Sequence, residues 1–510
     1  MDTRKKITEL AQKRILVLDG AFGSLIQAHR TSSGEPLSEN DFRGLGENGA
    51  QEERFASHPV PLKGCNDLLC LTQPELISGF CSAYLEAGAD IIETCSFNST
   101  AVSLADYGLA DAAYEICKTA AIIARKAAGA FSTPEKPRFV AGSMGPTAKS
   151  ASIAPDMDAP EKRAVSWDML AASYYDNVRG LLDGGADLIL IETVFDTLNA
   201  KAAVFAVKRI AEERGMDIPI IVSATVSDNG GKLLSGQSVE AFCASLLHAN
   251  PLALGLNCSF GAEKLKPYVA AISKAAPCLV IAYPNAGFPN RLGKYEETPV
   301  MMADQIEQYM REGLVNIVGG CCGTTPDHIA AIAKKAEMYA PRQAPASTGK
   351  TLLAGHDVME LNRELVLAVA QTAKQGSNTY QSEFNRLLKN KDYDGAVELV
   401  QESITAGAKF VDVCIDSFFY DSTESAKIVL SCFLNFALQF PCIARLPVFL
   451  NTASWDIAEA GLKCLQGKSL INALSLKSNS GEELKRRSRL VHFYGAAVLK
   501  DPDENEADPF

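Results

Sequence analysis

The sequence predicts an α/β protein: a (β/α)8 TIM barrel over residues 1–340, a linker over 341–355 and a partial second β/α barrel over 356–510. Three observations lead to this prediction. Short apolar runs alternate with segments that carry apolar residues at the helical period. Each run ends in a polar or glycine-rich turn, as strands of a buried parallel sheet do. Polar residues with useful chemistry gather at the ends of the runs.

Eight apolar runs are the expected strands of the first barrel. They lie at 14–20, 90–97, 138–145, 187–193, 218–226, 252–259, 278–285 and 314–321. Between them, segments such as AKAAVFAVKRIAEERG and VEAFCASLLHAN have apolar residues at i, i+3, i+4 and i+7, which is typical of helices. Strands that are buried on both faces and alternate with helices in this way favour a closed barrel over an open doubly wound sheet.

A stretch rich in proline, alanine and serine, APRQAPASTGKT (340–351), separates the two predicted domains. Further expected strands follow at 365–371, 410–416, 447–452, 471–477 and 495–500, and an acidic tail ends the chain. A short series of parallel strands leaves an open edge, which is unusual in an isolated domain. We therefore expect either that another element covers this edge or that the strands close differently from a full barrel.

Composition excludes several classes of partner. The formal net charge is −12 and no basic run is present, which argues against binding to nucleic acid or to an anionic membrane surface. The start of the chain, MDTRKKITELAQKRILVLDG, has too short an apolar segment for a signal peptide or a membrane span. We therefore expect a cytoplasmic protein whose 14 cysteines are reduced thiols, most of them packed in the core.

Polar or sulfur-containing residues fall near the C-terminal ends of the expected strands. They are Asp19, Thr94, Ser143, Glu192, Thr225, Asn257, Cys258, Asn285, Cys321 and Cys322. In a barrel, this end carries the loops that build the active site. A single pair such as Asp19-Gly20 is equally typical of an ordinary turn, but so many positions at one rim indicate a functional site.

Three of these residues, Cys258, Cys321 and Cys322, indicate a zinc site. The first ends the sixth expected strand, and the adjacent pair ends the eighth, where flanking glycines permit the backbone to leave strand alternation. No histidine lies at a strand end, so three thiolates and an open fourth position are expected, as in catalytic zinc sites. The alternatives are buried unreactive thiols or a redox pair, the latter disfavoured because adjacent cysteines form strained disulfides.

The chemistry of such a site favours alkyl transfer to sulfur. Three thiolates make zinc a weak Lewis acid for generating hydroxide, whereas a substrate thiol that binds zinc loses its proton. A helix is expected with Thr325 as N-cap and Pro326 as its first residue, and its free N–H groups suit a carboxylate. Asp19 and Glu192 suit an ammonium group. An amino-acid thiol meets these needs, with homocysteine as the first candidate and cysteine as the simplest rival.

A set of motifs runs in order through about residues 5–342: LDGAFGS, LKGCNDLLCLTQPELI, AGADIIETCSFNST, GGADLILIETVFDTLNAKAAVFAVK, GLNCSFG, YPNAGFPN and NIVGGCCGTTPDHIAAIA. Together they resemble the N-terminal half of cobalamin-dependent methionine synthases. The resemblance implies that Cys258, Cys321 and Cys322 hold zinc, that homocysteine reacts as its thiolate, and that methylcobalamin donates the methyl group. Betaine-homocysteine and S-methylmethionine-homocysteine methyltransferases share the cysteine motifs, but ETVFDTLNAKAAVFAVK is more similar to the cobalamin enzymes.

The remaining rim residues are the expected substrate-binding groups. They are Asp19, Thr94, Ser143, Glu192, Asn257 and Asn285.

The second part resembles the methyltetrahydrofolate-binding, or pterin-binding, barrel of the same enzymes. The segments that carry this resemblance are FNRLLKNKDYDGAVELVQESITAGAKFVDVCIDSFFYD and WDIAEAGLKCLQGKSLINALSLK. AKQGS (373–377) replaces the family's Gly-Glu-Arg-Thr-Asn stretch, and Cys414 replaces an asparagine. Asn451 replaces an aspartate that the resemblance implies would bind the pterin ring, whereas Asp412 and Asn472 remain. We therefore expect a truncated, degenerate pterin site and no folate binding.

Neither part resembles a cobalamin-binding domain, so we expect methylcobalamin to be supplied in trans by a separate corrinoid protein. Two other functions stay open. The same barrel chemistry serves a homocysteine methyltransferase with an S-methyl or betaine-type donor. A non-catalytic assembly subunit of a methyl-transfer complex would explain the divergent second domain, although the complete rim of the first barrel argues against it.

Overall fold

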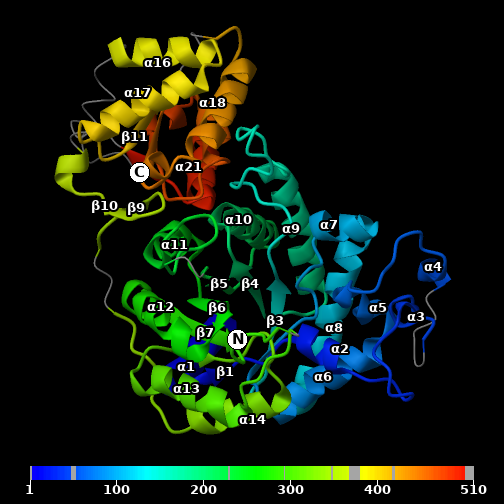
Figure 1. The fold of residues 1–510 in the computed structure, drawn as a ribbon. Coiled ribbons are helices and arrows are strands. Elements are labelled where there is room, and N and C mark those ends of the chain that lie inside the picture. The colour runs from blue at the N-terminus through cyan, green and yellow to red at the C-terminus, as the bar shows by residue number, and fades with distance from the viewer. Residues whose placement is uncertain are drawn as a thin grey trace.

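A computed structural model describes residues 3–46, 53–227, 230–291, 293–345, 349–366, 379–415 and 420–499. The chain forms two α/β lobes, a larger barrel and a smaller lobe that packs on one side of it (Figure 1). No helix in the described residues is long and apolar enough to span a membrane.

The first lobe is a barrel of parallel strands, as predicted. Its strands are β1 (Leu16–Val17), β2 (Ile91–Glu93), β3 (Phe139–Met144), β4 (Leu188–Val194), β5 (Ile220–Ala224), β6 (Ala253–Gly261), β7 (Leu279–Asn285) and β8 (Ile317–Val318). Their order in the sheet is β1-β8-β7-β6-β5-β4-β3-β2, and every pairing is parallel. A parallel bridge between Leu18 and Ile91 joins the two edge strands and closes the barrel.

Helices surround this barrel (Figure 1). The longer ones are α1 (Thr3–Lys13), α2 (Phe22–Ala28), α6 (Pro74–Glu86), α8 (Ala113–Phe131), α9 (Trp167–Asp183), α10 (Thr197–Arg214), α11 (Val239–Leu246), α12 (Ala262–Ala275), α13 (Pro299–Arg311) and α14 (Pro326–Ala336). Short helices α3 (Glu39–Phe42), α4 (Glu53–Ala56), α5 (Leu69–Thr72) and α7 (Ala101–Leu104) lie in the first two βα connections.

Alternation along the strands divides the core in two. Leu188 and Leu190 of β4 face the barrel interior, whereas Ile189 and Ile191 face the surrounding helices. Ile7 and other apolar residues of α1 pack against the interior cluster. All four β4 side chains are buried, which explains why the strand reads as one continuous apolar run.

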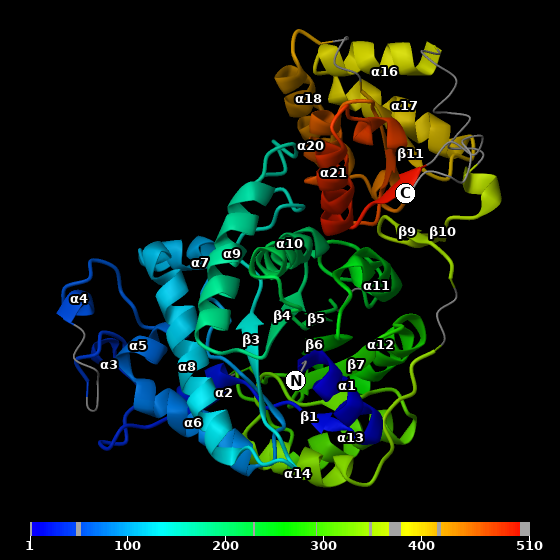
Figure 2. The ribbon, with the colours of Figure 1, turned by 180° about the vertical axis from the view of Figure 1, so that it is seen from behind.

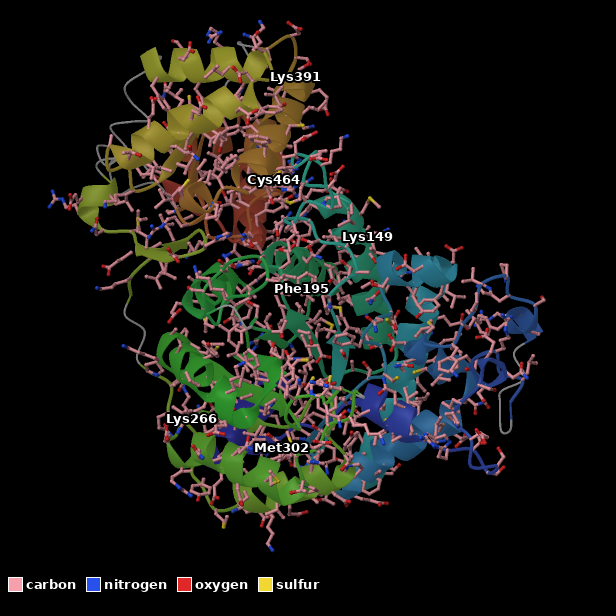
Figure 3. The ribbon with its side chains drawn as sticks, viewed as in Figure 1. Lys149, Phe195, Lys266, Met302, Lys391 and Cys464 are labelled. Atoms are coloured by element: carbon pink, nitrogen blue, oxygen red, sulfur yellow. The ribbon has the colours of Figure 1, made fainter. Side chains whose placement is uncertain are left out.

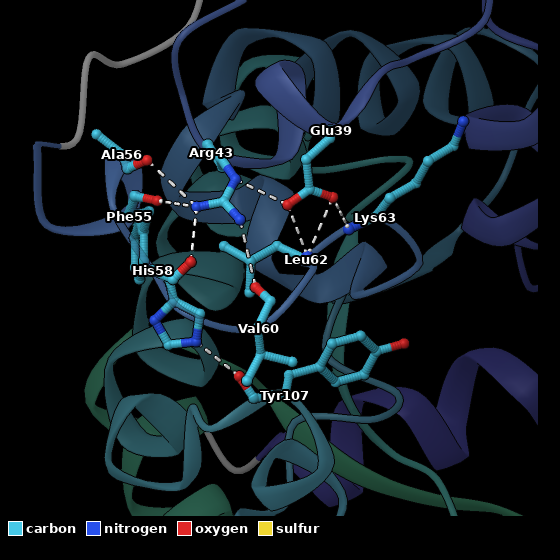
Figure 4. A network of polar contacts seen from close by, with 9 residues as sticks. All are labelled: Glu39, Arg43, Phe55, Ala56, His58, Val60, Leu62, Lys63 and Tyr107. Atoms are coloured by element: carbon cyan, nitrogen blue, oxygen red, sulfur yellow. Dashed lines mark hydrogen bonds and ion pairs between the residues drawn. The ribbon is translucent and has the colours of Figure 1, made fainter.

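A network of hydrogen bonds around one ion pair holds the long connection between α2 and α6 in place (Figure 4). The Arg43 guanidinium donates to the carbonyl oxygens of Phe55 (3.0 Å) and His58 (2.9 Å) and to Glu39 Oε1 (2.8 Å). The Glu39 carboxylate in turn accepts the backbone N–H of Leu62 (2.8 Å). His58 Nε2 lies 2.8 Å from the carbonyl oxygen of Tyr107, which ties this connection to the next one. These polar contacts act together with buried apolar side chains of the same connection, Phe42, Phe55 and Leu62 among them.

The second lobe contains a sheet of four parallel strands in the order β11-β12-β13-β14. They are β11 (Val411–Cys414), β12 (Val448–Asn451), β13 (Leu470–Asn472) and β14 (Ala497–Leu499). Its helices are α16 (Thr379–Lys389), α17 (Tyr393–Thr405), α18 (Thr423–Ala437), α19 (Pro441–Ala444), α20 (Trp455–Leu462) and α21 (Gly481–Tyr494). This is the partial β/α barrel that the sequence predicts.

Two strand predictions in this lobe need correction. Residues 363–366 are helical, so the strand predicted over 365–371 is wrong at Leu365 and Val366, and the rest of it lies outside the described residues. The strand predicted over 471–477 is β13 followed by a 3-10 helix, Ala473–Leu476. Both errors have one cause: a short apolar run does not by itself distinguish a buried strand from a buried helical turn.

Between the lobes, part of the expected linker is ordered. Strands β9 (Leu352–Ala354) and β10 (Val358–Glu360) form an antiparallel hairpin. Ala354 packs against Ala241 and Ala244 of α11, so this hairpin rests on the barrel.

The lobes meet through an aromatic cluster and a buried amine. Helix α21 lies against α10, as the view from behind also shows (Figure 2). The ring of Tyr494 lies 5.5 Å from Trp167 and 5.2 Å from Phe205, measured between centroids. Lys201 of α10 is 1% exposed, and its Nζ donates to the carbonyl oxygen of Leu465 at 3.2 Å. Burial lowers the pKa of Lys201 to about 7.

Candidate metal centre and active site

Three cysteine sulfurs come together at the C-terminal end of the barrel. The Sγ atoms of Cys258, Cys321 and Cys322 all lie within 4.8 Å of one another. Cys258 Sγ and Cys322 Sγ are 4.0 Å apart. All three side chains are partly exposed, unlike Cys117 and Cys243, which are buried in the helical layer. The trio therefore lies where a ligand from solvent can reach it.

The backbone at the end of β6 turns Cys258 toward the other two cysteines. Cys258 and Ser259 both have left-handed backbone conformations, with φ of 61° and 60°. Such conformations are uncommon for residues other than glycine and cluster at functional sites. The pairing of β6 with β7 shifts register between Asn257 and Gly261, so an irregularity of the ladder accommodates this turn.

The turn after β8 presents Cys321 and Cys322. Cys321 N donates to the carbonyl oxygen of Pro284 at 2.8 Å, and Cys322 N donates to Asn285 Oδ1 at 3.1 Å. At Gly320 an added Cβ would lie 2.3 Å from the Thr324 side chain, so only glycine fits. The glycine-flanked turn thus lets two consecutive thiols face one site, as the spacing predicted.

Hydrogen bonds among the thiols determine their proton affinities. Cys322 accepts from Cys258 and Cys321, which lowers the pKa of Cys322 to about 3. Donation to Cys258 and to Cys322, together with burial, raises the pKa of Cys321 well above its usual value. The trio therefore holds one thiolate readily, and a bound cation is needed to hold more negative charge.

Carboxyl groups line the barrel interior next to the thiols. Asp19 is 1% exposed, and its Oδ2 accepts the backbone N–H of Glu93 at 3.0 Å. Glu192 is 3% exposed and accepts from Ser143 Oγ and, at 3.4 Å, from the Tyr283 hydroxyl. Asp19 Oδ1 has no hydrogen-bond partner among the described residues. A buried carboxylate oxygen without a donor is typical of a site that receives one from a ligand.

Burial disfavours the charged form of these acids. It raises the pKa of Glu192 to about 7 and, together with the neighbouring Glu192 charge, raises the pKa values of Asp19 and Glu93 well above their usual range. A cationic group placed among them would reverse this effect, because it favours ionised carboxylates. The pocket is therefore suited to an ammonium group.

The family of the chain follows from its sequence match over this barrel. Residues 16–336 match the family model described as homocysteine S-methyltransferase. The chain belongs to the homocysteine S-methyltransferase family. Residues 377–500 match a second family model, described as pterin binding enzyme. Membership of the first family supports an enzyme that methylates homocysteine.

Solved structures with similar folds include the homocysteine methyltransferase MmuM from Escherichia coli. Its oxidized form is 24% identical to this chain with a TM-score of 0.47, over 64% of this chain and 98% of that chain. Its metallated form is 24% identical with a TM-score of 0.46, over the same shares. A putative phosphonomutase from Burkholderia cenocepacia J2315 is 13% identical with a TM-score of 0.31, over 63% of this chain and 92% of that chain.

Other predicted rim residues of the barrel position their neighbours. Asn257 accepts the N–H of Thr193 (3.0 Å) and the hydroxyl of Ser223 (2.7 Å), and its Nδ2 lies 3.9 Å from Cys321 Sγ. Asn285 holds the backbone of Cys322. Direct substrate binding by these two asparagines stays a prediction, because the contacts above are to the protein itself.

Thr94 and Ser143 form a chain that leads to Glu192. Thr94 Oγ1 accepts the N–H of Ser143 at 2.9 Å and lies 2.6 Å from Ser96 Oγ. Ser143 Oγ donates to Glu192. Thr225 contacts Ser259 through their hydroxyls, beside Cys258. These short polar side chains orient the groups that face the barrel mouth.

Helix α14 begins as predicted at Pro326, with Thr325 as N-cap. His328 completes a capping box, with its Nδ1 2.8 Å from Thr325 Oγ1 and its Nε2 2.9 Å from the carbonyl oxygen of Glu297. Sequence alone indicates no role for His328, Glu93, Tyr283 or Tyr295. Tyr295 hydrogen-bonds Cys322. Glu93 and Tyr283 lie in strands, and no distinctive spacing in the sequence identifies them as site residues.

At the predicted pterin site, the polar side chains contact one another, and Asp412 Oδ1 has no hydrogen-bond partner among the described residues. Asn472 Nδ2 donates to Asn451 Oδ1 at 3.0 Å, and Asp412 hydrogen-bonds Asn451 and Gln381. Burial raises the pKa of Asp412 to about 7. The AKQGS stretch (373–377) lies outside the described residues.

Proposed function

We propose that this chain is a methionine synthase-type homocysteine S-methyltransferase. In this proposal Cys258, Cys321 and Cys322 hold zinc, homocysteine reacts as a thiolate, and methionine is the product. The methyl group comes from methylcobalamin on a separate corrinoid protein and ultimately from methyltetrahydrofolate. The observation that carries this proposal is the cluster of three cysteine sulfurs within 4.8 Å of one another, at the same rim as the buried carboxyl groups of Asp19 and Glu192.

The geometry of the sulfurs fits a zinc ion. Tetrahedral coordination with zinc–sulfur bonds of about 2.3 Å puts two sulfurs about 3.8 Å apart. Cys258 Sγ and Cys322 Sγ, at 4.0 Å, are close to this spacing without rearrangement of the backbone. When bound there, zinc favours the thiolate form of a substrate thiol, so that the sulfur is nucleophilic at neutral pH.

The carboxyl pocket accounts for the amino end of homocysteine. Asp19 Oδ1 is buried and lacks a donor among the described residues, and an ammonium group supplies one. Glu192 is held toward the barrel interior by Ser143 and Tyr283. The start of α14 offers N–H groups to the substrate carboxylate. Substrate held at both ends in this way has its sulfur fixed for attack on a methyl carbon.

The second lobe supports a donor that comes from outside this chain. Its predicted pterin site has Asn451 in place of an acid, and that amide already pairs with Asn472 and Asp412. The resemblance of the barrel to cobalamin-dependent enzymes points to a corrinoid as the immediate donor. A corrinoid protein that docks at the barrel mouth would present its methyl group to the homocysteine sulfur.

Zinc content and methyl transfer test the proposal directly. We expect the purified protein to contain zinc, measured by plasma emission, and to form methionine from homocysteine and free methylcobalamin. Cys321→Ala removes one of three ligands and is expected to abolish both. Cys243→Ala, a buried cysteine far from the trio, is the matched control and keeps both. Normal zinc content and methylation in Cys321→Ala would contradict the zinc assignment.

The donor is tested separately. Methylcobalamin, S-methylmethionine and betaine are offered to the same protein with homocysteine, and methionine is measured. Transfer from methylcobalamin alone supports the proposed donor. Transfer only from the sulfonium or betaine compound would overturn the corrinoid part and leave the zinc part standing.

A further inference from the structure

A cavity of about 320 Å³ lies between the two lobes, away from the cysteine trio. Its walls come from the β3–α9 and β5–α11 loops of the barrel and from the loop that follows α20 in the second lobe. Cys464, labelled in Figure 3, belongs to the second-lobe wall. The volume is at the lower end of the range for small-molecule sites and suits a small ligand.

Three polar atoms in this lining have no partner in the described part of the chain. They are Ser152 Oγ, Ser235 Oγ and Gln466 Oε1. Ser235 and Gln466 are each only 8% exposed. Buried polar side chains normally have hydrogen-bond partners, so three unsatisfied atoms around one cavity indicate that its occupant supplies them.

The orientation of Gln466 is fixed by its nitrogen. Gln466 Nε2 donates to the carbonyl oxygen of Ser235 at 3.1 Å and lies 2.8 Å from His356 Nε2. Burial lowers the pKa of His356 to about 4, so this ring is neutral near pH 7 and its Nε2 accepts. Rotating the amide would place its oxygen against the Ser235 carbonyl. Gln466 Oε1 is therefore an acceptor that is available to a ligand.

A positive charge borders the same cavity. The Arg163 guanidinium donates to backbone carbonyl oxygens, those of Ala151 at 3.0 Å and Asn435 at 2.8 Å among them. Its other hydrogen-bond acceptors among the described residues are also carbonyl oxygens, those of Pro160 and Lys162. The lining thus combines a cation, two hydroxyl groups and a carbonyl acceptor with the apolar side chains of Ile153 and Leu438.

We infer that this interlobe cavity binds a free α-amino acid with an unbranched apolar side chain, of which methionine is the example. The ammonium group donates to Gln466 Oε1, and the carboxylate accepts from the hydroxyls of Ser152 and Ser235 on the side of Arg163. The apolar side chain lies against Leu438. A simple anion would leave Gln466 Oε1 unpaired, and an apolar molecule would leave all three polar atoms unpaired.

Binding here would link the lobes, because Ser152 and Ser235 belong to the barrel and Gln466 to the second lobe. A ligand that contacts both stabilises their docked arrangement in proportion to its concentration. The choice of methionine rests on the proposed function, since methionine is the proposed product. The cavity would then sense the product at a place distinct from the metal centre.

Calorimetric titration with L-methionine tests the inference. The titration uses the full chain carrying Asp19→Asn, which weakens binding of an ammonium group at the barrel mouth. We expect a saturable binding event in this protein. Adding Ser235→Val, or separately Gln466→Leu, is expected to weaken it at least ~10-fold through loss of one hydrogen bond to a charged group. Adding Gln401→Leu, a partly exposed glutamine of the same lobe outside the cavity lining, leaves the affinity unchanged.

Two analogues test the recognition of each end. 4-(Methylthio)butanoate lacks the ammonium group and L-methionine methyl ester lacks the carboxylate, so both are expected to bind at least ~10-fold more weakly. Absence of binding in the Asp19→Asn protein, or equal affinity in the Ser235→Val and Gln401→Leu proteins, would overturn the inference. Binding in a protein that fails to methylate homocysteine would overturn the proposed function and leave this site standing.

Discussion

Both lobes carry polar residues at the C-terminal ends of parallel strands, but the hydrogen bonding of these residues differs between the lobes. In the barrel, Asp19 keeps an unpaired buried oxygen, and three thiols face one another across a partly exposed site. In the second lobe, Asn472 and Asn451 pair directly with each other, and the unpaired oxygen is Asp412 Oδ1. Polar groups aimed at a site remain available to ligands, whereas groups that satisfy one another stabilise the fold.

This contrast arises from single residues. At the barrel rim, Asn257 accepts the backbone N–H of Thr193, and Asn285 accepts the backbone N–H of Cys322. These bonds hold the backbone around the three cysteines. At the second rim, the family resemblance implies an aspartate where Asn451 stands. An amide donates as well as accepts, so it pairs with both Asp412 and Asn472.

Removal of zinc is expected to have the largest effect and to affect only the barrel. Dialysis against a strong chelator should abolish methylation of homocysteine, because the substrate thiol then keeps its proton. The second lobe has no part in the cysteine trio, so its unfolding should be unchanged. Activity is measured before and after zinc is restored, and circular dichroism follows unfolding. Full activity in the zinc-free protein would show that the trio is not a catalytic metal site.

Asp19→Asn is expected to have the next largest effect. The amide keeps the hydrogen bond from the Glu93 backbone but removes a charge that would pair with the substrate ammonium. Loss of one such charged pair costs about 2–3 kcal/mol, so KM for homocysteine should rise ~30–100-fold while kcat changes less. Steady-state kinetics measure both constants. Asp217→Asn, an exposed acid on the far side of the barrel, serves as control.

Much of this fold is predictable from sequence, because its strands are fully buried. Runs such as 187–193 and 278–285 are continuous and apolar, so they mark β4 and β7 clearly, and the strand-end rule then brings distant residues to one rim. The run at 365–371 shows the limit of this reasoning: an equally apolar segment begins as a helix. Hydrophobicity identifies what is buried more reliably than it identifies the conformation in which it is buried.

The fine geometry of the candidate site is not readable from sequence. No pattern indicates that Cys258 and Ser259 take left-handed conformations, because ordinary residues do so only when the surrounding contacts require it. Likewise, Glu93 and Tyr283 contribute through pairings across the barrel that depend on its closure. Sequence identifies which residues reach the rim, and the barrel contacts determine which of them face a ligand.

Asn451→Asp restores the aspartate that the family resemblance implies at this position, and so tests the role of Asn451 in the second lobe. Two buried carboxyls, at 412 and 451, would then adjoin each other, and their repulsion is expected to lower the free energy of unfolding by about 2 kcal/mol at pH 8. The loss should shrink at pH 5, where one of the two carboxyls is protonated. Urea unfolding at both pH values measures it, with Asn390→Asp on the lobe surface as control. Calorimetric titration with methyltetrahydrofolate should show no binding to the unmodified protein.

The smallest predicted effect is a dependence of homocysteine binding on pH, and it belongs to the barrel alone. Burial raises the pKa of Glu192 from 4.5 to about 7 in the folded protein. The folded protein therefore binds this proton more tightly than the unfolded chain does. The contribution of Glu192 to the free energy of unfolding is complete below about pH 4.5 and is lost as pH rises through about 7. The ionised form binds an ammonium group better. Between pH 6 and pH 8, apparent affinity for homocysteine should therefore rise several-fold while the ligand-free barrel becomes less stable.

Glu192→Gln separates this titration from that of the substrate and the thiols. Glutamine can still accept from Ser143 through its amide oxygen, and its amide nitrogen can donate to the Tyr283 hydroxyl. It does not ionise, so both pH dependences should flatten while the zinc content stays unchanged. Binding is measured by calorimetry and stability by urea unfolding across the same pH series. If the variant kept the full pH dependence of binding, the titrating group would lie elsewhere at the barrel mouth. Asp19 and Glu93 would then be the groups to replace, because their pKa values are also raised by the same burial.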